Sequence, residues 1–115
     1  MSTYTTIPLS AATTGEPIAV TGTTTGTSVL AHTSINVGGD FDEIELFANN
    51  QSASSVELTV EVGGTAASDL IIRTIPPYAT KLVLEGIYLN GGATVQAFAT
   101  VANVVNLFGK VGRTE

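Results

Sequence analysis

The densest group of potentially reactive side chains in the sequence is acidic. Asp40, Asp42, Glu43 and Glu45 lie within six consecutive positions. Carboxylate oxygens can bind Ca²⁺, but calcium loops space their ligands in a regular pattern that these residues lack. In an extended strand Glu43 and Glu45 share one face, and Asp42 points to the other. We therefore interpret the group as the solvated outer face of a strand and predict no metal ligand in it.

A second acidic strand raises the question of a carboxylate pair. Glu57 and Glu61 alternate with apolar residues, and we expect them beside Glu43 and Glu45 on a neighbouring strand of the same sheet. Paired carboxylates hydrolyse glycosides. Such enzymes also need aromatic platforms for the sugar, and the chain has no Trp and only three Tyr. We expect no catalytic pair, and the same shortage weighs against a carbohydrate-binding module, which stays an alternative.

His32 is the only histidine of the chain. A Ser–His–Asp set could include it, but the sequence has no G-x-S-x-G nucleophile elbow, and one histidine cannot build a multi-histidine zinc site. The GGTAAS segment at 63–68 lacks the lysine and the helix of a phosphate-binding loop. We predict that His32 is a hydrogen-bonded strand residue and that the chain is not an enzyme, with no catalytic, cofactor-binding or metal-binding residues and no cofactor.

The charge balance and the apolar segments limit the partners. The chain carries 4 basic and 10 acidic residues, a net charge of −6, and its basic residues Arg73, Lys81, Lys110 and Arg113 are scattered. Nucleic acids and anionic membranes require clustered basic residues, so we expect neither as a partner. No apolar run approaches ~20 residues and no signal-peptide pattern opens the chain, so we expect no membrane span. With no cysteine, disulfides and thiolate metal sites are ruled out.

Alternating apolar residues and glycine-rich turns recur along most of the chain. Eight segments carry the strand pattern at a spacing of ~8–12 residues, which is typical of a sandwich or barrel. They cover residues 16–22, 28–37, 41–49, 56–62, 69–75, 80–89, 93–100 and 103–112. We predict an all-β fold with essentially no helix, a β-sandwich of about eight strands that is either immunoglobulin-like or a jelly roll. The cysteine and tryptophan hallmarks of immunoglobulin domains are missing, so the topology stays open.

The first 15 residues differ from the rest. They are rich in Thr, Ser and Ala and carry no charged side chain, and Pro8 favours extended backbone around it. We predict an extended N-terminal arm at 1–15, followed by a single β-sandwich domain at 16–115. We expect the arm to lie over a neighbouring subunit by strand addition; a frayed terminus is the alternative.

Apolar side chains outside the expected core are candidates for partner contacts. Ile71 and Ile72 are adjacent and apolar, so their strand should be covered on both faces, by a second sheet or by a neighbouring subunit. Several exposed aromatic residues on one sheet would form a protein-binding patch. The candidate partner contacts are Tyr4, Ile7, Pro8, Leu9, Phe47, Phe98 and Phe108.

The segment 56–113 carries a series of turn motifs. It has a V-G-G-T turn at 62–65, a Thr-Ile-Pro turn at 74–76, an Asn-Gly-Gly hairpin at 90–92 and an A-N-V-V segment at 102–105. Gly109 and Arg113 follow that segment. This series resembles that of small structural proteins of tailed bacteriophages. Where those phage proteins have Ala-Gly after the first proline, this chain has Pro77 and Tyr78.

The resemblance implies a capsid decoration (cement) protein. Such a protein is synthesised in the host cytoplasm, forms dimers or trimers, and binds the major capsid protein on the surface of the virion, where it stabilises the head. The family has no active site, so no site residue carries over. The alternatives are another virion component, such as a head fibre base, a tail protein or an adaptor protein, and a carbohydrate- or receptor-binding module.

Overall fold

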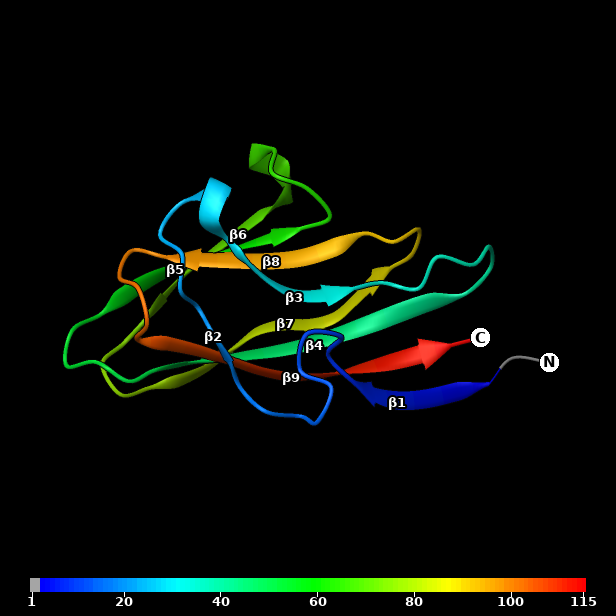
Figure 1. Cartoon of the computed structure of the whole chain (residues 1–115), viewed down its shortest axis with the longest axis horizontal. Helices are drawn as coiled ribbons and strands as arrows, with labels where there is room; N and C mark the ends of the chain where they lie inside the picture. Colours follow the sequence, from blue (N-terminus) through cyan, green and yellow to red (C-terminus); the bar gives the residue numbers. More distant parts are fainter. Residues whose placement is uncertain (1–2) are drawn as a thin grey trace.

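The chain folds into two antiparallel β-sheets that pack face to face (Figure 1). In the computed structural model, which describes residues 3–115, the Cα atoms span 49 × 27 × 19 Å. The longest dimension runs along the strands (Figure 1). The helical turns η1 (Thr25–Thr27) and η2 (Ala67–Asp69) have three residues each, and in residues 3–115 no helix is long and apolar enough to cross a bilayer. The predicted all-β sandwich is confirmed.

Nine strands of residues 3–115 form the two sheets. Each of the eight predicted strand segments overlaps one of them, and the ninth lies in the predicted arm. The first sheet consists of β1 (Tyr4–Pro8), β2 (Ile18–Ala19), β4 (Phe41–Asn50), β7 (Thr80–Leu89) and β9 (Val105–Thr114). The second sheet consists of β3 (Val29–Thr33), β5 (Val56–Val62), β6 (Leu70–Ile75) and β8 (Thr94–Ala99). Both β1 and β2 pair with the edge of β9 that faces away from β4, so together they fill one strand position.

The pairing of the strands is that of a jelly roll. The β5–β6 hairpin lies at the centre of a nested set in which β4 pairs with β7, β3 with β8, and β2 with β9. The chain is therefore one long antiparallel hairpin rolled into two sheets, as in jelly-roll domains. Immunoglobulin-like sandwiches pair several sequential strands within one sheet, whereas in residues 3–115 β5 and β6 are the only consecutive strands that pair with each other. The topology left open by the sequence is thus the jelly roll.

The strict alternation predicted for β4 holds in the structure. Ile44, Leu46 and Ala48 are fully buried between the sheets, while Glu43 and Glu45 point outward. Asp42 points inward with the core residues, as the alternation required.

The acidic residues of β5 lie elsewhere than predicted. Strand β5 belongs to the second sheet, because the chain crosses from one sheet to the other between β4 and β5. Glu57 and Glu61 are therefore not beside Glu43 and Glu45, and that prediction is wrong.

The described part of the predicted arm, residues 3–15, belongs to the sandwich. β1 pairs with β9 of its own chain, and Leu9 and Ala12 are 1% and 3% exposed in the core. The predicted boundary between an arm at 1–15 and a domain at 16–115 is therefore wrong, and Met1 and Ser2 lie outside the described residues. The physical reason is that β1 satisfies backbone groups along β9, and Leu9 adds apolar burial at the same end of the core.

The Ile71–Ile72 pair is covered on one side only. Ile71 packs against the core, while Ile72 is 54% exposed on the outer face of the second sheet. β6 is an edge strand, and its outer face keeps an apolar side chain in solvent.

Candidate functional site

A buried network of hydrogen bonds surrounds the carboxylate of Asp42. The Arg113 guanidinium donates from Nε to Oδ1 at 2.8 Å and from Nη2 to Oδ2 at 3.0 Å. Oδ2 also accepts the Ile35 backbone N–H at 3.0 Å and lies 2.8 Å from Nε2 of His32. The Asp42 and His32 side chains are both fully buried. This carboxylate therefore connects β4 to β3 and to β9.

The hydrogen bonds of His32 fix its tautomer. Its Nδ1 accepts the backbone N–H of Ser10 at 3.0 Å, so Nε2 carries the proton that is donated to Asp42. A register shift in β3 between Leu30 and His32 lets Ala31 and His32 both point into the core. The prediction that His32 is a hydrogen-bonded strand residue is confirmed.

Ser10, His32 and Asp42 are close together, but their geometry is not that of a nucleophile and its base. Ser10 meets the ring through its backbone N–H, and its Oγ accepts the backbone N–H of Thr33 instead. A catalytic serine needs its hydroxyl on the imidazole and an open approach for substrate. His32 and Asp42 are buried, and the set fastens the segment after β1 to β3.

The electrostatics of the network keep the carboxylate ionised. Burial alone would raise the pKa of Asp42, but hydrogen bonds from Arg113, His32 and the Ile35 backbone outweigh burial and lower the pKa to about 2. The hydrogen bond to Asp42 raises the pKa of Arg113 in turn. The buried charge is thus paired and hydrogen-bonded, which is the condition for keeping one in a core.

The outer face of the first sheet gathers aromatic side chains. We call it the outer aromatic face and define it by Tyr4, Phe41, Phe47, Tyr88 and Phe108. Phe47 on β4 lies directly opposite Phe108 on β9, and the rings of Phe41 and Tyr88 meet edge to face with centroids 5.1 Å apart. Tyr4 and Tyr88 are 65% and 62% exposed. Much of this aromatic surface is in contact with solvent.

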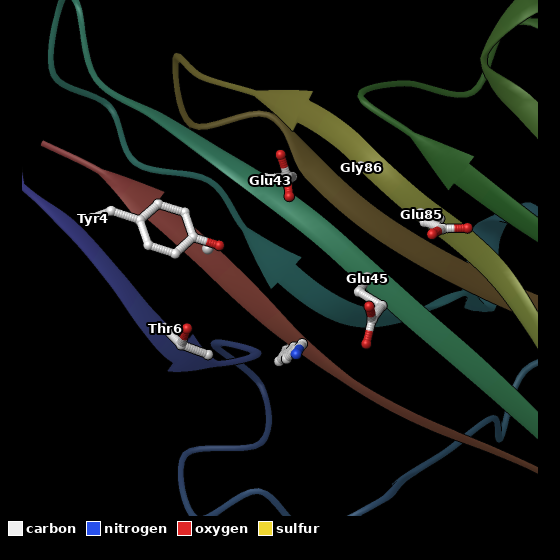
Figure 2. A pocket seen from close by; sticks show the side chains of 8 residues that line it. Tyr4, Thr6, Glu43, Glu45, Glu85 and Gly86 are labelled. Carbon is white, nitrogen blue, oxygen red and sulfur yellow. The ribbon is translucent and has the colours of Figure 1, made fainter.

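A shallow hollow, the outer depression, lies on the same face and has a volume of about 250 Å³. Figure 2 shows the side chains around it: Tyr4 and Thr6 from β1, Glu43 and Glu45 from β4, and Glu85 from β7. Gly86, Lys110 and Gly112 complete the lining. The Tyr4 ring lies over Gly112, so a side chain at Gly112 would overlap the phenol. Gly86 has nothing within 4 Å of its Cβ position, so the hollow is open down to the backbone of β7.

The outer depression is acidic. Glu43, Glu45 and Glu85 face a single ammonium group, that of Lys110, and none of these four forms an ion pair within residues 3–115. Tyr88 lies opposite Glu43 in the β4–β7 pairing, and the Glu43 carboxylate raises the pKa of Tyr88. In the described part of the chain no set of three His, Cys, Asp or Glu side chains is placed to hold a metal ion.

A second hollow of about 210 Å³ adjoins Tyr88. It is lined by Phe41, Tyr88, Leu89 and Asn90, and we call it the apolar shelf. Because Tyr88 lines the shelf and lies opposite Glu43 of the outer depression, an apolar hollow and an acidic one lie side by side.

The structure brings together some of the predicted contact residues. Tyr4, Phe47 and Phe108 share the outer aromatic face, and Pro8 is exposed at its margin on β1. Phe98 lies on β8, in the other sheet, so the predicted aromatic residues do not form a single patch.

Two predicted contacts lie against or within the core. Leu9 is 1% exposed, so the prediction that it meets a partner is wrong. Ile7 is partly buried against the core, opposite Val111. Both side chains are used to attach the N-terminal segment to the sandwich.

Tyr88 is a surface residue outside the predicted partner contacts. Its alternation with Ile87 and Leu89 was a usable signal for its outward direction. Its position opposite Glu43 was not predictable, because β4 and β7 pair with two register shifts.

Comparison with known protein families finds no match to this chain, and a search of curated proteins finds no relative. The function is therefore argued from the fold and its surface.

Proposed function

We propose that the chain is a non-enzymatic structural protein of a bacteriophage virion, a capsid decoration protein that binds the lattice of the major capsid protein and stabilises the head. The observation that carries the proposal is the outer aromatic face, an exposed aromatic surface on a sandwich whose buried Asp42 network serves structure. Exposed apolar patches of this kind mark sites of protein interaction. The resemblance of segment 56–113 to phage structural proteins supports the same assignment.

The mechanism is mechanical. Packaged DNA strains the joints between capsomers, and a rigid sandwich that bridges a joint adds buried apolar area across it. An interface of roughly 800 Å² per partner is the usual size for a specific contact. Burial stabilises by about 25 cal/mol per Å² before the costs of association. A dimer or trimer of the chain would engage several joints at once, and avidity would slow its release.

Binding to heads tests the proposal. Purified chain is mixed with expanded heads that lack it, from the phage that encodes it, and the bound copies are counted after sedimentation. A copy number in simple ratio to the major capsid protein supports decoration. A few copies per particle would indicate a vertex, tail or fibre protein, and no binding would remove the proposal.

A matched pair of tyrosine variants identifies the face that binds. Tyr88→Ser removes an exposed ring from the outer aromatic face, while Tyr78→Ser removes an equally exposed ring from the turn between β6 and β7. Aromatic residues at the centre of an interface carry much of its affinity. We expect Tyr88→Ser to weaken head binding by roughly tenfold or more and Tyr78→Ser to leave it unchanged.

A carbohydrate- or receptor-binding module is the second candidate. The observation that favours it is the placement of Tyr4 and three carboxylates around one hollow, since sugars stack on aromatic rings and hydrogen-bond to carboxylates. Jelly rolls occur in both viral capsid proteins and lectins. A glycan-array signal that Tyr4→Ala abolishes would favour this function over decoration.

A further inference from the structure

The outer aromatic face has a charge that restricts its partner. The outer depression carries three carboxylates and one ammonium group, which sum to 1 − 3 = −2. The side chains that line it leave this charge uncompensated within residues 3–115. A partner that covers the face would desolvate these carboxylates, and binding is favourable only if it supplies compensating positive charge.

We propose that the outer aromatic face docks on a basic protein surface, with an arginine or lysine side chain of the partner entering the outer depression and an adjacent apolar side chain resting on the apolar shelf. This inference deepens the proposed function, on which it rests for the identity of the partner. The inference predicts that the capsid surface beneath the chain exposes a basic residue next to an apolar one.

The geometry of the outer depression suits a cationic side chain. Gly86 and Gly112 place no side chain in the hollow, so an incoming chain can reach the carboxylates of Glu43 and Glu45. Carboxylates bind guanidinium groups through charge-assisted, often bidentate hydrogen bonds. The Tyr4 ring is packed on Gly112 on one side and is 65% exposed overall. Its solvent-facing side can therefore receive a cation–π contact.

The same charges disfavour a second copy of the chain as the occupant. Two copies meeting through this face would bring −2 against −2, which is repulsive. Of the chain's four basic residues, Arg113 is bound to Asp42 and Lys110 already lines the outer depression. Only Arg73 and Lys81 remain, so a different protein is the better source of positive charge.

A basic peptide serves as the probe. The full chain, labelled with ¹⁵N, is titrated with an acetylated and amidated peptide of alternating glycine and arginine. The amide signals of Gly86 and Gly112 report on the floor of the outer depression. The test variant is Glu43→Gln/Glu45→Gln, and the matched control is Glu16→Gln/Glu57→Gln, which removes the same charge from exposed positions outside the outer depression.

We expect the largest chemical-shift changes at the amides of Gly86 and Gly112. The affinity for the peptide should fall roughly fivefold or more in the test variant, because two charge pairs are lost. The control should bind the peptide within about twofold of wild type, because only distant charges differ. Equal loss in both variants, or shifts centred elsewhere, would show that net charge alone attracts the peptide and would overturn the inference. A response to an oligosaccharide and none to the peptide would overturn it in favour of a sugar site.

The head-binding assay separates this inference from the proposed function. If wild type binds heads and the two double variants bind equally well, the basic-partner inference fails and the decoration function stands. If wild type does not bind heads, the decoration function fails, and the peptide titration still decides whether the outer depression takes a basic side chain.

Discussion

At the scale of single residues, the hydrogen bonds of Asp42 stabilise the jelly roll. Its carboxylate accepts hydrogen bonds from Arg113, His32 and the Ile35 backbone. Asp42→Asn would turn an amide toward these donors and leave Arg113 without its counter-ion. We expect a loss of about 3–5 kcal/mol in the free energy of unfolding, the usual cost of breaking a buried pair.

Urea unfolding at neutral pH measures this loss. The neighbouring substitution Glu43→Gln, on the outer face, is the control and should change stability by less than about 0.5 kcal/mol. A loss in Asp42→Asn as small as that of the control would contradict the assignment of the network as a structural tie.

The lowered pKa of Asp42 also predicts a pH dependence. The folded pKa is about 2, below the ordinary value of 3.8, so ionised Asp42 stabilises the folded state at pH values above the ordinary pKa. That contribution is lost as the pH falls from about 4 toward 2, and it amounts to about 2 kcal/mol. Unfolding of wild type and Asp42→Asn across this range isolates it, since the difference between them should shrink as the pH falls. A constant difference would contradict the lowered pKa.

Some of these residue roles could be read from the sequence, and others could not. Alternation placed Asp42 inward and Glu43 outward, because side-chain direction in a strand depends only on neighbouring positions. The partner of Asp42 could not be found this way, since Arg113 lies 71 residues along the chain. Ser10 was hidden for the same reason: its backbone N–H reaches His32 only through the fold.

At the scale of elements, the N-terminal segment behaves as part of the domain. Leu9 is fully packed between the sheets, so Leu9→Ala should lower the free energy of unfolding by about 2–5 kcal/mol through lost burial and a residual cavity. Thr5→Ala, at an exposed position of β1, should cost less than about 0.5 kcal/mol. Thermal or urea unfolding distinguishes the two, and a Leu9→Ala variant as stable as Thr5→Ala would restore the free-arm hypothesis.

Replacement by alanine should affect stability differently at two glycines of β9. A side chain at Gly109 would overlap the backbone carbonyl of Glu45 on β4, whereas one at Gly112 would meet only the tip of the Tyr4 ring. Backbone cannot move aside without opening the β4–β9 ladder, so Gly109→Ala should destabilise by about 1–3 kcal/mol or more.

Gly112→Ala should keep most of the stability, because the Tyr4 ring can swing away, but it should alter the outer depression. Unfolding experiments measure the first effect, and the near-ultraviolet tyrosine signal reports the second. Equal stability of the two variants would show that the strands are not as close at Gly109 as the structure has them.

The elements themselves were largely predictable from period and turn chemistry. Segments such as β4 and β5 alternate cleanly, and glycine-rich turns separate them. β1 was not recognised as a sheet strand, because its Thr-rich sequence has little apolar alternation to report. The assignment of β5 to the second sheet could not be predicted either, since the alternation of side chains along a strand does not specify which strand it pairs with.

At the scale of the whole molecule, the two sheets give the sandwich two different outer faces. The first sheet carries the outer aromatic face, while η1 and η2 lie beyond the second sheet on the opposite side (Figure 1). η1 is fastened there by the Thr25 hydroxyl, which donates to the Glu61 carboxylate. A chain that docks through its outer aromatic face therefore turns η2 toward solvent.

Peptide tags inserted on the two sides of the sandwich test which outer face meets the partner. A short tag between Thr65 and Ala66, in the exposed loop before η2, should leave head binding intact and stay accessible to an antibody on the decorated particle. The same tag between Asn90 and Gly91, beside the apolar shelf, should block binding by steric overlap while circular dichroism still shows a folded sandwich. If instead the tag at residue 65 blocks binding and the tag at residue 90 does not, the chain meets its partner through the second sheet, where Ile72 and Phe98 would be the contacts to examine.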